Sequence, residues 1–258
     1  MSRVLITGAS RGIGRATAVE AVRRGHEVIA TARNITALDG IDGLAGRLAL
    51  DVTDQASVDD AVASTGRLDA LISNAGETIR GPIESIPLGE VRRLFELNTL
   101  GALRVTQAVL PGFRAQGSGH VLYLSSILGR IAIPLVGAYA ASKWALEAIA
   151  ETLAIEAGQF GVRVTLLEPG QVSTGAPEAA PSYLDDDSPY APIAAAMSEA
   201  PDPAVLISPE DAASAIVDAL ESETPALRVP VGTPAILGLA DRRDQPDDQP
   251  FVWRPRTA

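Results

Sequence analysis

The chain has 258 residues, of which 47% are hydrophobic, with no cysteine and a formal net charge of −11. The missing cysteines exclude disulfides, thiolate metal sites and cysteine nucleophiles, and two histidines, His26 and His120, give a zinc site or a Ser-His-Asp hydrolase poor support. We therefore expect no metal ion. The acidic balance repels phosphate backbones and anionic membrane surfaces, so neither nucleic acid nor a membrane is an expected partner, although acidity also serves solubility alone.

Short apolar runs alternate with longer segments of helical periodicity along the chain. Several runs, such as Val121–Leu124, are apolar throughout, which is typical of a parallel sheet covered on both faces. The alternation predicts an α/β fold with a doubly wound sheet of about seven parallel strands and helices on both faces. The predicted strands are Val4–Thr7, Glu27–Thr31, Arg47–Leu50, Ala70–Ser73, His120–Ser125, Val162–Leu167 and Leu227–Val231. The predicted helices are Ile13–Arg24, Ser57–Ala63, Gly89–Ala115, Ala138–Gly158 and Pro209–Glu221.

Two stretches break this alternation. Gly175–Pro203 is rich in Pro, Ala, Ser and Asp, and the tail Asp241–Ala258 is rich in Asp, Arg, Gln and Pro. No internal repeat or second-domain boundary is visible, so residues 1–240 are predicted to form one domain. The sequence enters its first strand without a charged and then apolar leader, and it has no run of about 18 apolar residues. We expect a cytoplasmic protein without a signal peptide or a transmembrane helix.

A glycine-rich turn joins the first predicted strand to the first helix. It reads Thr-Gly-Ala-Ser-Arg-Gly-Ile-Gly over Thr7–Gly14. Glycines allow a sharp turn and a close approach to a pyrophosphate, toward which the helix N-terminus directs free N–H groups. A glycine triplet alone is weak evidence, but its place between a strand and a helix predicts a dinucleotide site. The predicted contacts are Gly8, Ser10, Arg11, Gly12, Ile13 and Gly14.

The end of the second strand indicates which dinucleotide binds. Selectivity for NAD requires an acidic residue there to bind the ribose hydroxyls, but the sequence reads Ala-Thr-Ala-Arg and ends on Arg33. An arginine suits a 2′-phosphate, and Arg11 in the glycine turn is a second candidate. These residues predict NADP(H); the alternative is two solvated arginines.

Tyr139 and Lys143 are spaced four residues apart in a predicted helix, which places them on one face, one turn apart. A phenol with a pKa near 10 is a poor acid or base at neutral pH, and a nearby cation lowers that pKa. We expect Lys143 to lower the pKa of Tyr139, so that the phenol can exchange a proton with a substrate oxygen. On an ordinary helix the same spacing gives only a surface pair.

The glycine turn and the Tyr-x-x-x-Lys spacing together resemble the short-chain dehydrogenases/reductases, from about Arg3 to Val231. The resemblance implies a Rossmann-like fold. It also implies that Ser126, thirteen residues before Tyr139, binds the substrate carbonyl, with Ser125 as the neighbouring competitor. Asn98 lies inside a predicted helix, where Asn is unfavourable, and the matching family residue kinks the helix and anchors a water chain to the lysine.

The resemblance assigns further cofactor contacts to the residues that follow the third, fourth and sixth strands. Ligands bind at the carboxyl ends of strands in open α/β sheets. Ser73 departs from the Asn that begins the family's Asn-Asn-Ala-Gly motif. The additional contacts are Asp51, Val52, Asn74, Ala75, Gly76, Pro169, Gly170, Val172 and Thr174, with Tyr139 and Lys143 also touching the cofactor.

The implied function is an NADP(H)-dependent carbonyl reductase that interconverts a hydrophobic ketone and a secondary alcohol. Apolar residues between Ser126 and Tyr139 suggest the hydrophobic substrate, although about half of them are expected to be core. The stretch 175–205 matches the family's variable lid and contributes Tyr183 and Tyr190, and Tyr139–Leu167 resembles steroid- and retinoid-active members. The predicted substrate residues are Ser126, Leu128, Ile133, Leu135, Tyr139 and Gln171.

Three alternatives remain in view. Enoyl reductases of this superfamily use a longer Tyr-to-Lys spacing, and the sugar-nucleotide members are longer chains with a different glycine spacing. A catalytically inactive NADP sensor usually loses Tyr139 or Lys143, which this chain keeps.

The helices Gly89–Ala115 and Ala138–Gly158 are the family's usual subunit contacts. The resemblance therefore implies a homodimer or a homotetramer, with Leu94, Leu97 and Leu103 serving core or interface.

Overall fold

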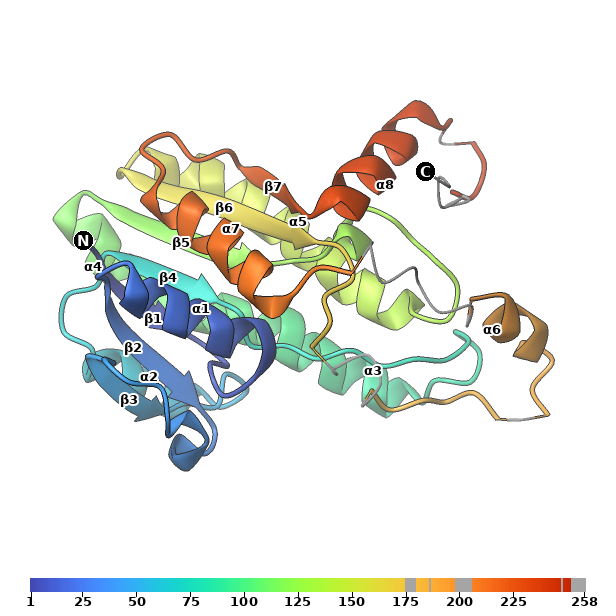
Figure 1. Ribbon diagram of the computed structural model, residues 1–258, viewed down its shortest axis with the longest axis horizontal. Helices are drawn as coiled ribbons and strands as arrows, with labels where there is room; N and C mark the ends of the chain where they lie inside the picture. Colours follow the sequence, from blue (N-terminus) through green and yellow to red (C-terminus); the bar gives the residue numbers. More distant parts are fainter. Residues whose placement is uncertain (175–179, 186, 198–205, 247, 252–258) are drawn as a thin grey trace.

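The sheet contains seven strands in the order β3-β2-β1-β4-β5-β6-β7, and every neighbouring pair is parallel (Figure 1). The computed structural model describes residues 1–174, 180–185, 187–197, 206–246 and 248–251. The strand bounds lie close to the predicted ones. They are β1 Arg3–Ile6, β2 Glu27–Ala32, β3 Gly46–Ala49, β4 Ala70–Ser73, β5 Gly119–Leu124, β6 Val162–Pro169 and β7 Arg228–Val231.

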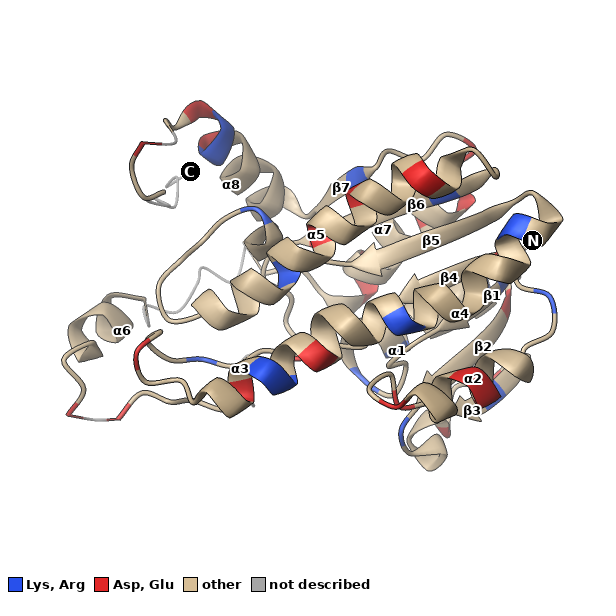
Figure 2. Ribbon diagram, turned by 180° about the vertical axis from the view of Figure 1, so that it is seen from behind, with Lys and Arg blue, Asp and Glu red and all other residues tan. Residues whose placement is uncertain are grey.

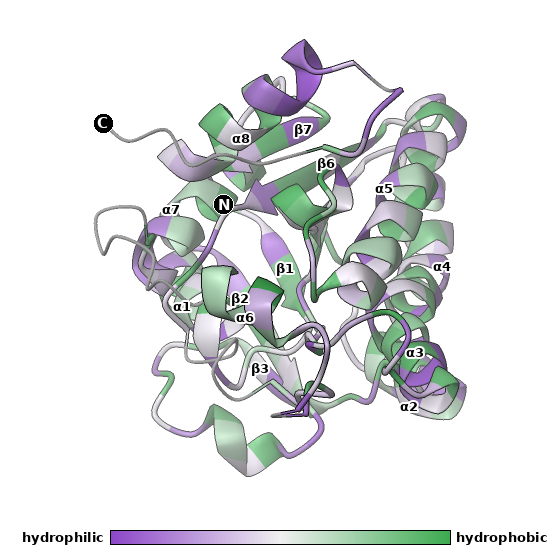
Figure 3. Ribbon diagram, turned by 90° about the vertical axis from the view of Figure 1, so that its right-hand side faces the viewer, coloured by the Kyte–Doolittle hydropathy of each residue, from purple (hydrophilic) through white to green (hydrophobic). Residues whose placement is uncertain are grey.

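Helices cover both faces of the sheet (Figure 3). One face packs against α1 and α7, and the other against α2, α4 and α5, which gives a separate hydrophobic cluster on each side. The predicted α/β fold with about seven parallel strands and two helical layers is confirmed. The helix bounds are α1 Gly12–Arg23, α2 Gln55–Ala63, α3 Leu88–Phe95, α4 Gly101–Gln116, α5 Gly137–Gly158, α6 Ala191–Met197, α7 Pro209–Glu221 and α8 Thr233–Asp244.

The strand order reverses direction at β1, which lies between β2 and β4. Leu5 of β1 pairs with Ile29 on one side and with Leu71 on the other. All strands are parallel, so their carboxyl ends meet at one edge of the sheet. At this reversal the connections leave β1 and β4 toward opposite faces, which is where open α/β sheets bind ligands.

The prediction of one continuous α-helix over Gly89–Ala115 is wrong for the middle of that range. A π-helical segment, Glu96–Leu100, separates α3 from α4. Its Asn98 is buried and hydrogen-bonded outside the helix, and a Cβ on Gly101 would lie 2.7 Å from Cγ2 of Val52. The helix is therefore widened at the point where Asn98 makes hydrogen bonds outside it. The helical periodicity of the sequence does not reveal this widening.

The sequence pattern missed α8, and the predicted boundary between residues 240 and 241 falls inside this helix. Pro234 occupies its first turn, a favourable place for proline. Ala235 is buried with Ile127 and Ile131, and Phe251 packs against the same cluster. The described part of the predicted tail is thus attached to the domain beside β7 (Figure 1).

The predicted lid is described only in part, because residues 175–179, 186 and 198–205 lie outside the described ranges. Backbone bonds join its first segment to the loop after β4: Arg80 N donates to Pro181 O at 2.9 Å, and Tyr183 N donates to Arg80 O at 2.8 Å. Of the helices described, none is long and apolar enough to cross a membrane. Acidic and basic residues are interspersed over the face that α3, α4 and α5 form (Figure 2).

Candidate active site

The turn after β1 is fastened to the turn after β4 by side-chain hydrogen bonds. The hydroxyl of Thr7 accepts bonds from the backbone N–H groups of Asn74 and Ala75, at 3.0 and 3.1 Å. In return, the Asn74 amide donates to the carbonyl oxygens of Thr7 and Gly8, at 2.8 and 3.0 Å. These bonds fix the two loops on either side of the reversal in strand order. Sequence reasoning did not assign this role to Thr7.

The glycine turn leaves room for a pyrophosphate. Gly8 and Gly12 have φ values of 67° and 54°, a region that favours glycine. Arg11, the residue that precedes α1, is extended, no side chain caps the helix, and its first turn holds no acid. Thr174 lies across from the turn, 3.4 Å from the position of a Cβ on Gly12. The residues therefore fit the phosphates of a dinucleotide.

Gly14→Ala is expected to destabilise the turn by about 1–3 kcal/mol and to weaken cofactor binding, since the side chain has no space. A Cβ at Gly14 would lie 2.3 Å from Asn74 Nδ2 and 2.4 Å from Gly8 O. Thermal unfolding and cofactor titration measure the two effects. Gly112→Ala in α4 is the matched control, because nothing lies within 4 Å of its Cβ and alanine favours a helix. Equal stability of the two variants would contradict this account.

The two arginines predicted to bind a 2′-phosphate are exposed at the same edge. Within the described part of the chain, the side chain of neither Arg11 nor Arg33 has a hydrogen-bond or ion-pair partner. Asp51 accepts bonds from the N–H and hydroxyl of Thr53, which, with the nearby charge of Arg33, hold the pKa of the carboxyl below its usual value. The side chain of Val52 is buried in the core.

The turn after β5 brings Ser126 to the start of α5. Ser126 is buried, its hydroxyl accepts a bond from Leu128 N at 3.1 Å, and its interaction with the phenol of Tyr139 lowers the pKa of that phenol. The hydroxyl of Ser125, in contrast, is buried without a partner among the described residues. Ser126, the serine that lies thirteen residues before Tyr139, is therefore the one whose hydroxyl acts on the Tyr139 phenol.

Lys143 is buried one turn after Tyr139, and it is the only lysine in the chain. Its Nζ donates to Leu124 O at 2.7 Å and lies 5.9 Å from the centroid of the Tyr139 ring. Burial lowers the pKa of Lys143 to about 8, and the charge of Glu147 opposes that fall. The lysine is therefore close enough to act on the ring, within the range of a cation–π contact.

The expected lowering of the Tyr139 pKa is wrong for the protein by itself. Burial raises the pKa of Tyr139 to about 12, and the hydrogen bond to Ser126 opposes the rise. Desolvation of the phenolate is the largest cause of the rise, and burial also lowers the pKa of Lys143. At neutral pH the phenol keeps its proton.

Asn98 holds the loop after β4 against α5. Its amide nitrogen donates to Glu77 O and to the hydroxyl of Ser142, at 2.9 and 3.0 Å, while its oxygen accepts from Glu77 N at 3.0 Å. A Cβ on Gly76 would lie 3.1 Å from Asn98 Oδ1 and 3.7 Å from Lys143 Nζ, so these groups are close together. Ser142, which sequence reasoning missed, links Asn98 to the helix that carries Lys143.

The predicted substrate residues do not form a single group. Leu128 and Ile133 pack against the cluster that includes Ala235, so part of their surface is core. Leu135 has a φ of 66°, an unfavourable conformation for a residue with a Cβ, and its carbonyl accepts a bond from Gly81 N at 2.7 Å. The Gln171 side chain is exposed.

The described part of the predicted lid packs against the same hydrophobic cluster as Tyr139. Tyr183 and Tyr139 both pack against the cluster of Ile79, Ile86, Leu94 and Ala138, while the Tyr190 hydroxyl donates to Glu84 at 2.7 Å. Of the leucines assigned to either core or interface, Leu94 is buried in this cluster.

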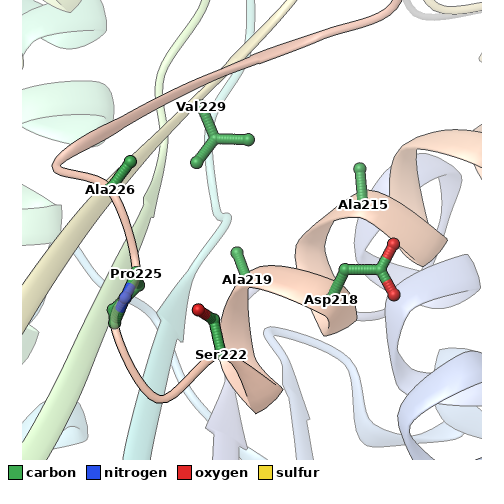
Figure 4. Close-up of a pocket in the computed structure, with 7 residues that line it drawn as sticks. All are labelled: Ala215, Asp218, Ala219, Ser222, Pro225, Ala226 and Val229. Carbon is green, nitrogen blue, oxygen red and sulfur yellow. The ribbon is translucent and has the colours of Figure 1, made fainter.

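A hollow of about 250 Å³ lies between α7 and β7, away from these residues (Figure 4). It is lined by Ala215, Asp218, Ala219, Ser222, Pro225, Ala226 and Val229. Pro225 and Ala226 precede β7, so the hollow lies near the amino ends of the strands, opposite the edge that carries Tyr139. None of the candidate active-site residues lines it.

Comparison with known proteins identifies the family. The model of the short chain dehydrogenase family matches residues 2–182, more than half of the chain. The chain belongs to the short-chain dehydrogenase family. It is therefore an oxidoreductase of a family that binds nicotinamide cofactors and acts on small molecules.

Curated relatives cover much of the same chain. Oxidoreductase BOA17 of Botryotinia fuckeliana (strain B05.10) is 35% identical in an alignment of 243 positions, gaps included, that covers 90% of this chain and 89% of that protein. Mouse 17-beta-hydroxysteroid dehydrogenase type 1 is 34% identical in an alignment of 278 positions that covers 96% of this chain and 79% of that protein. Human retinol dehydrogenase 8 is 36% identical in an alignment of 183 positions that covers 66% of this chain but only 59% of that protein.

Solved structures show the same fold in short-chain dehydrogenases. One from Streptomyces avermitilis is 37% identical, with a TM-score of 0.82, covering 95% of this chain and 93% of that one. One from Burkholderia cenocepacia in complex with NADP is 27% identical, with a TM-score of 0.78 and 94% of each chain covered.

Proposed function

We propose that this protein is an NADP(H)-dependent carbonyl reductase that interconverts a hydrophobic ketone and a secondary alcohol. The observation that carries the proposal is the meeting of Ser126, Tyr139 and Lys143 at the edge of the sheet that also holds the glycine turn. The exposed Arg11 and Arg33 support a 2′-phosphate. The Burkholderia neighbour in complex with NADP supports the same cofactor, and the steroid and retinol dehydrogenases among the relatives support a hydrophobic substrate.

Each catalytic side chain has a distinct part in the reduction. When bound, NADPH supplies the hydride for the carbonyl carbon. The Ser126 hydroxyl donates a hydrogen bond to the carbonyl oxygen, and Tyr139 donates the proton that completes the alcohol. The raised pKa of Tyr139 keeps the phenol protonated, which is the form that reduction needs. Lys143 stabilises the phenolate that is left and would hold the nicotinamide ribose.

The hydrogen bonds of Asn98 keep these side chains in position. Asn98 joins the loop after β4 to α5 through Glu77 and Ser142, so that Lys143 and Gly76 stay close. The residues that would hold the dinucleotide are those of the glycine turn, Asp51 and Val52 after β3, the Asn74–Gly76 loop, Pro169 at the end of β6, and Gly170, Val172 and Thr174 after it.

A panel of hydrophobic ketones, including long-chain and polycyclic ones, tests this function. The loss of NADPH absorbance should depend on the ketone and should be faster than the loss of NADH absorbance under the same conditions. Binding of NADPH without turnover of any ketone would instead support an NADP-binding sensor of the same fold. Faster turnover with NADH would contradict the assignment of Arg11 and Arg33.

We further propose a homodimer or homotetramer formed through α4 and α5. Trp144 and Ile155 of α5 are exposed apolar side chains, as is Leu100, the residue before α4. Light scattering after size-exclusion chromatography measures the mass of the particle, and a monomer would contradict the proposal.

A further inference from the structure

Two buried carboxylates lie beside Arg228, and one of them is on the same helix as Lys143. Glu147 of α5 is 5% exposed, and Glu168 near the end of β6 is fully buried. Arg228 of β7 serves both: its Nε donates to Glu147 Oε2 at 2.9 Å and lies 3.7 Å from Glu168 Oε1. Arg130 lies 3.5 Å from the same oxygen of Glu168. The buried pair therefore depends on guanidinium groups for its charge balance.

The polar atoms of this region are incompletely bonded. Within the described ranges, Ser125 Oγ, Glu147 Oε1 and both oxygens of Glu168 are buried without a hydrogen-bond partner. Two of these atoms lie beside Gly129, where a Cβ would be 2.8 Å from Ser125 Oγ and 3.3 Å from Glu147 Oε1. Buried polar atoms without partners are rare, and such clusters occur more often at functional sites than elsewhere.

The cluster reaches the active site through α5. Glu147 lies one turn after Lys143, and its charge counteracts the fall in the Lys143 pKa that burial causes. We propose that Glu147 is a positioning residue of the active site: a buried carboxylate, fixed by Arg228, that keeps Lys143 charged beside Tyr139. This inference rests on the proposed function, in which the ammonium group stabilises the phenolate.

The other charged groups of the cluster determine the pKa of Glu168. Burial raises the pKa of Glu168 to about 7, the charge of Glu147 adds to the rise, and Arg130 and Arg228 oppose it. Glu168 thus takes up a proton near neutrality, which relieves the repulsion between the two carboxylates. Glu151, the next acid along α5, is exposed, and its carboxylate pairs with Nη2 of Arg228 at 2.6 Å.

The single lysine allows a direct test in the protein without cofactor or substrate. Isotope labelling of lysine gives one side-chain signal, whose NMR titration reports the pKa of Lys143. Glu147→Gln should lower the titration midpoint by about one pH unit, because loss of a nearby anion disfavours the ammonium form. Glu151→Gln is the matched control, since it also removes a carboxylate from Arg228, and it should leave the midpoint unchanged.

The activity of the holoenzyme gives the second readout. Activity that needs charged Lys143 is lost as the pH rises through its pKa, so Glu147→Gln should move the basic limb of the kcat profile to lower pH, with KM little changed. Glu147→Asp, which retains the charge, should restore most of the wild-type midpoint. If Glu147→Gln does not fold, Arg228→Gln replaces it, because it removes the guanidinium group that fixes the Glu147 carboxylate.

An unchanged Lys143 midpoint in folded Glu147→Gln would overturn the inference. An equal shift in Glu151→Gln would also overturn it, since the effect would then not be specific to the buried carboxylate. Absence of turnover in the wild type would refute the proposed function but leave the lysine titration readable, so the two failures are distinguishable.

Discussion

Tyr139→Phe is expected to abolish turnover while NADPH still binds. The substitution removes the proton donor and leaves the ring in place over Lys143, so the loss concerns proton transfer. A positioned general acid contributes about 10²–10⁴-fold to a rate. Steady-state kinetics measure the loss, and fluorescence titration with NADPH measures binding.

Tyr123→Phe is the matched control for this experiment. The Tyr123 phenol is also buried, but it pairs with the Thr106 hydroxyl at 2.7 Å inside the core. We expect this variant to be less stable by about 1 kcal/mol, the contribution of one hydrogen bond, and to retain turnover. Near wild-type turnover in Tyr139→Phe would refute the assignment of the tyrosine.

The double variant Arg11→Ala, Arg33→Ala is expected to lose its preference for NADPH. Each charged hydrogen bond to a phosphate is worth about 1.5–3 kcal/mol, so the affinity for NADPH should fall by at least about tenfold per arginine. NADH lacks the 2′-phosphate, and its binding should change little. The ratio of kcat/KM for the two cofactors measures the preference.

Arg67→Ala is the control for the loss of positive charge. Arg67 is exposed beside Asp69, ahead of β4 and therefore at the amino edge of the sheet. It should leave the cofactor ratio unchanged. An equal loss of NADPH and NADH affinity in the double variant would mean that the arginines act on the fold or on features common to both cofactors.

The order of the elements could be predicted from the sequence because its signals are local. Apolar runs such as Val121–Leu124 and the helical periodicity of α5 depend on neighbours a few residues apart. The same holds for the glycine turn and for Tyr139 and Lys143, which one helical turn brings to one face. Where the pattern failed, at α8 and at the π-helical segment, the deciding contacts come from elsewhere: Ala235 packs on Ile131, and Asn98 bonds Glu77 and Ser142.

The sequence by itself thus determined the fold class, and it predicted the cofactor turn and the pair of Tyr139 and Lys143. Only the tertiary structure decided the charge states around that pair. Desolvation depends on what surrounds a group, so burial raises the pKa of Tyr139 where the lysine alone predicted a fall. The contact of Glu147 with Arg228 joins residues 81 positions apart, and no local pattern encodes it. The helical spacing brings Tyr139 and Lys143 to one face of α5, and the packing around the two side chains determines the pH at which each is charged.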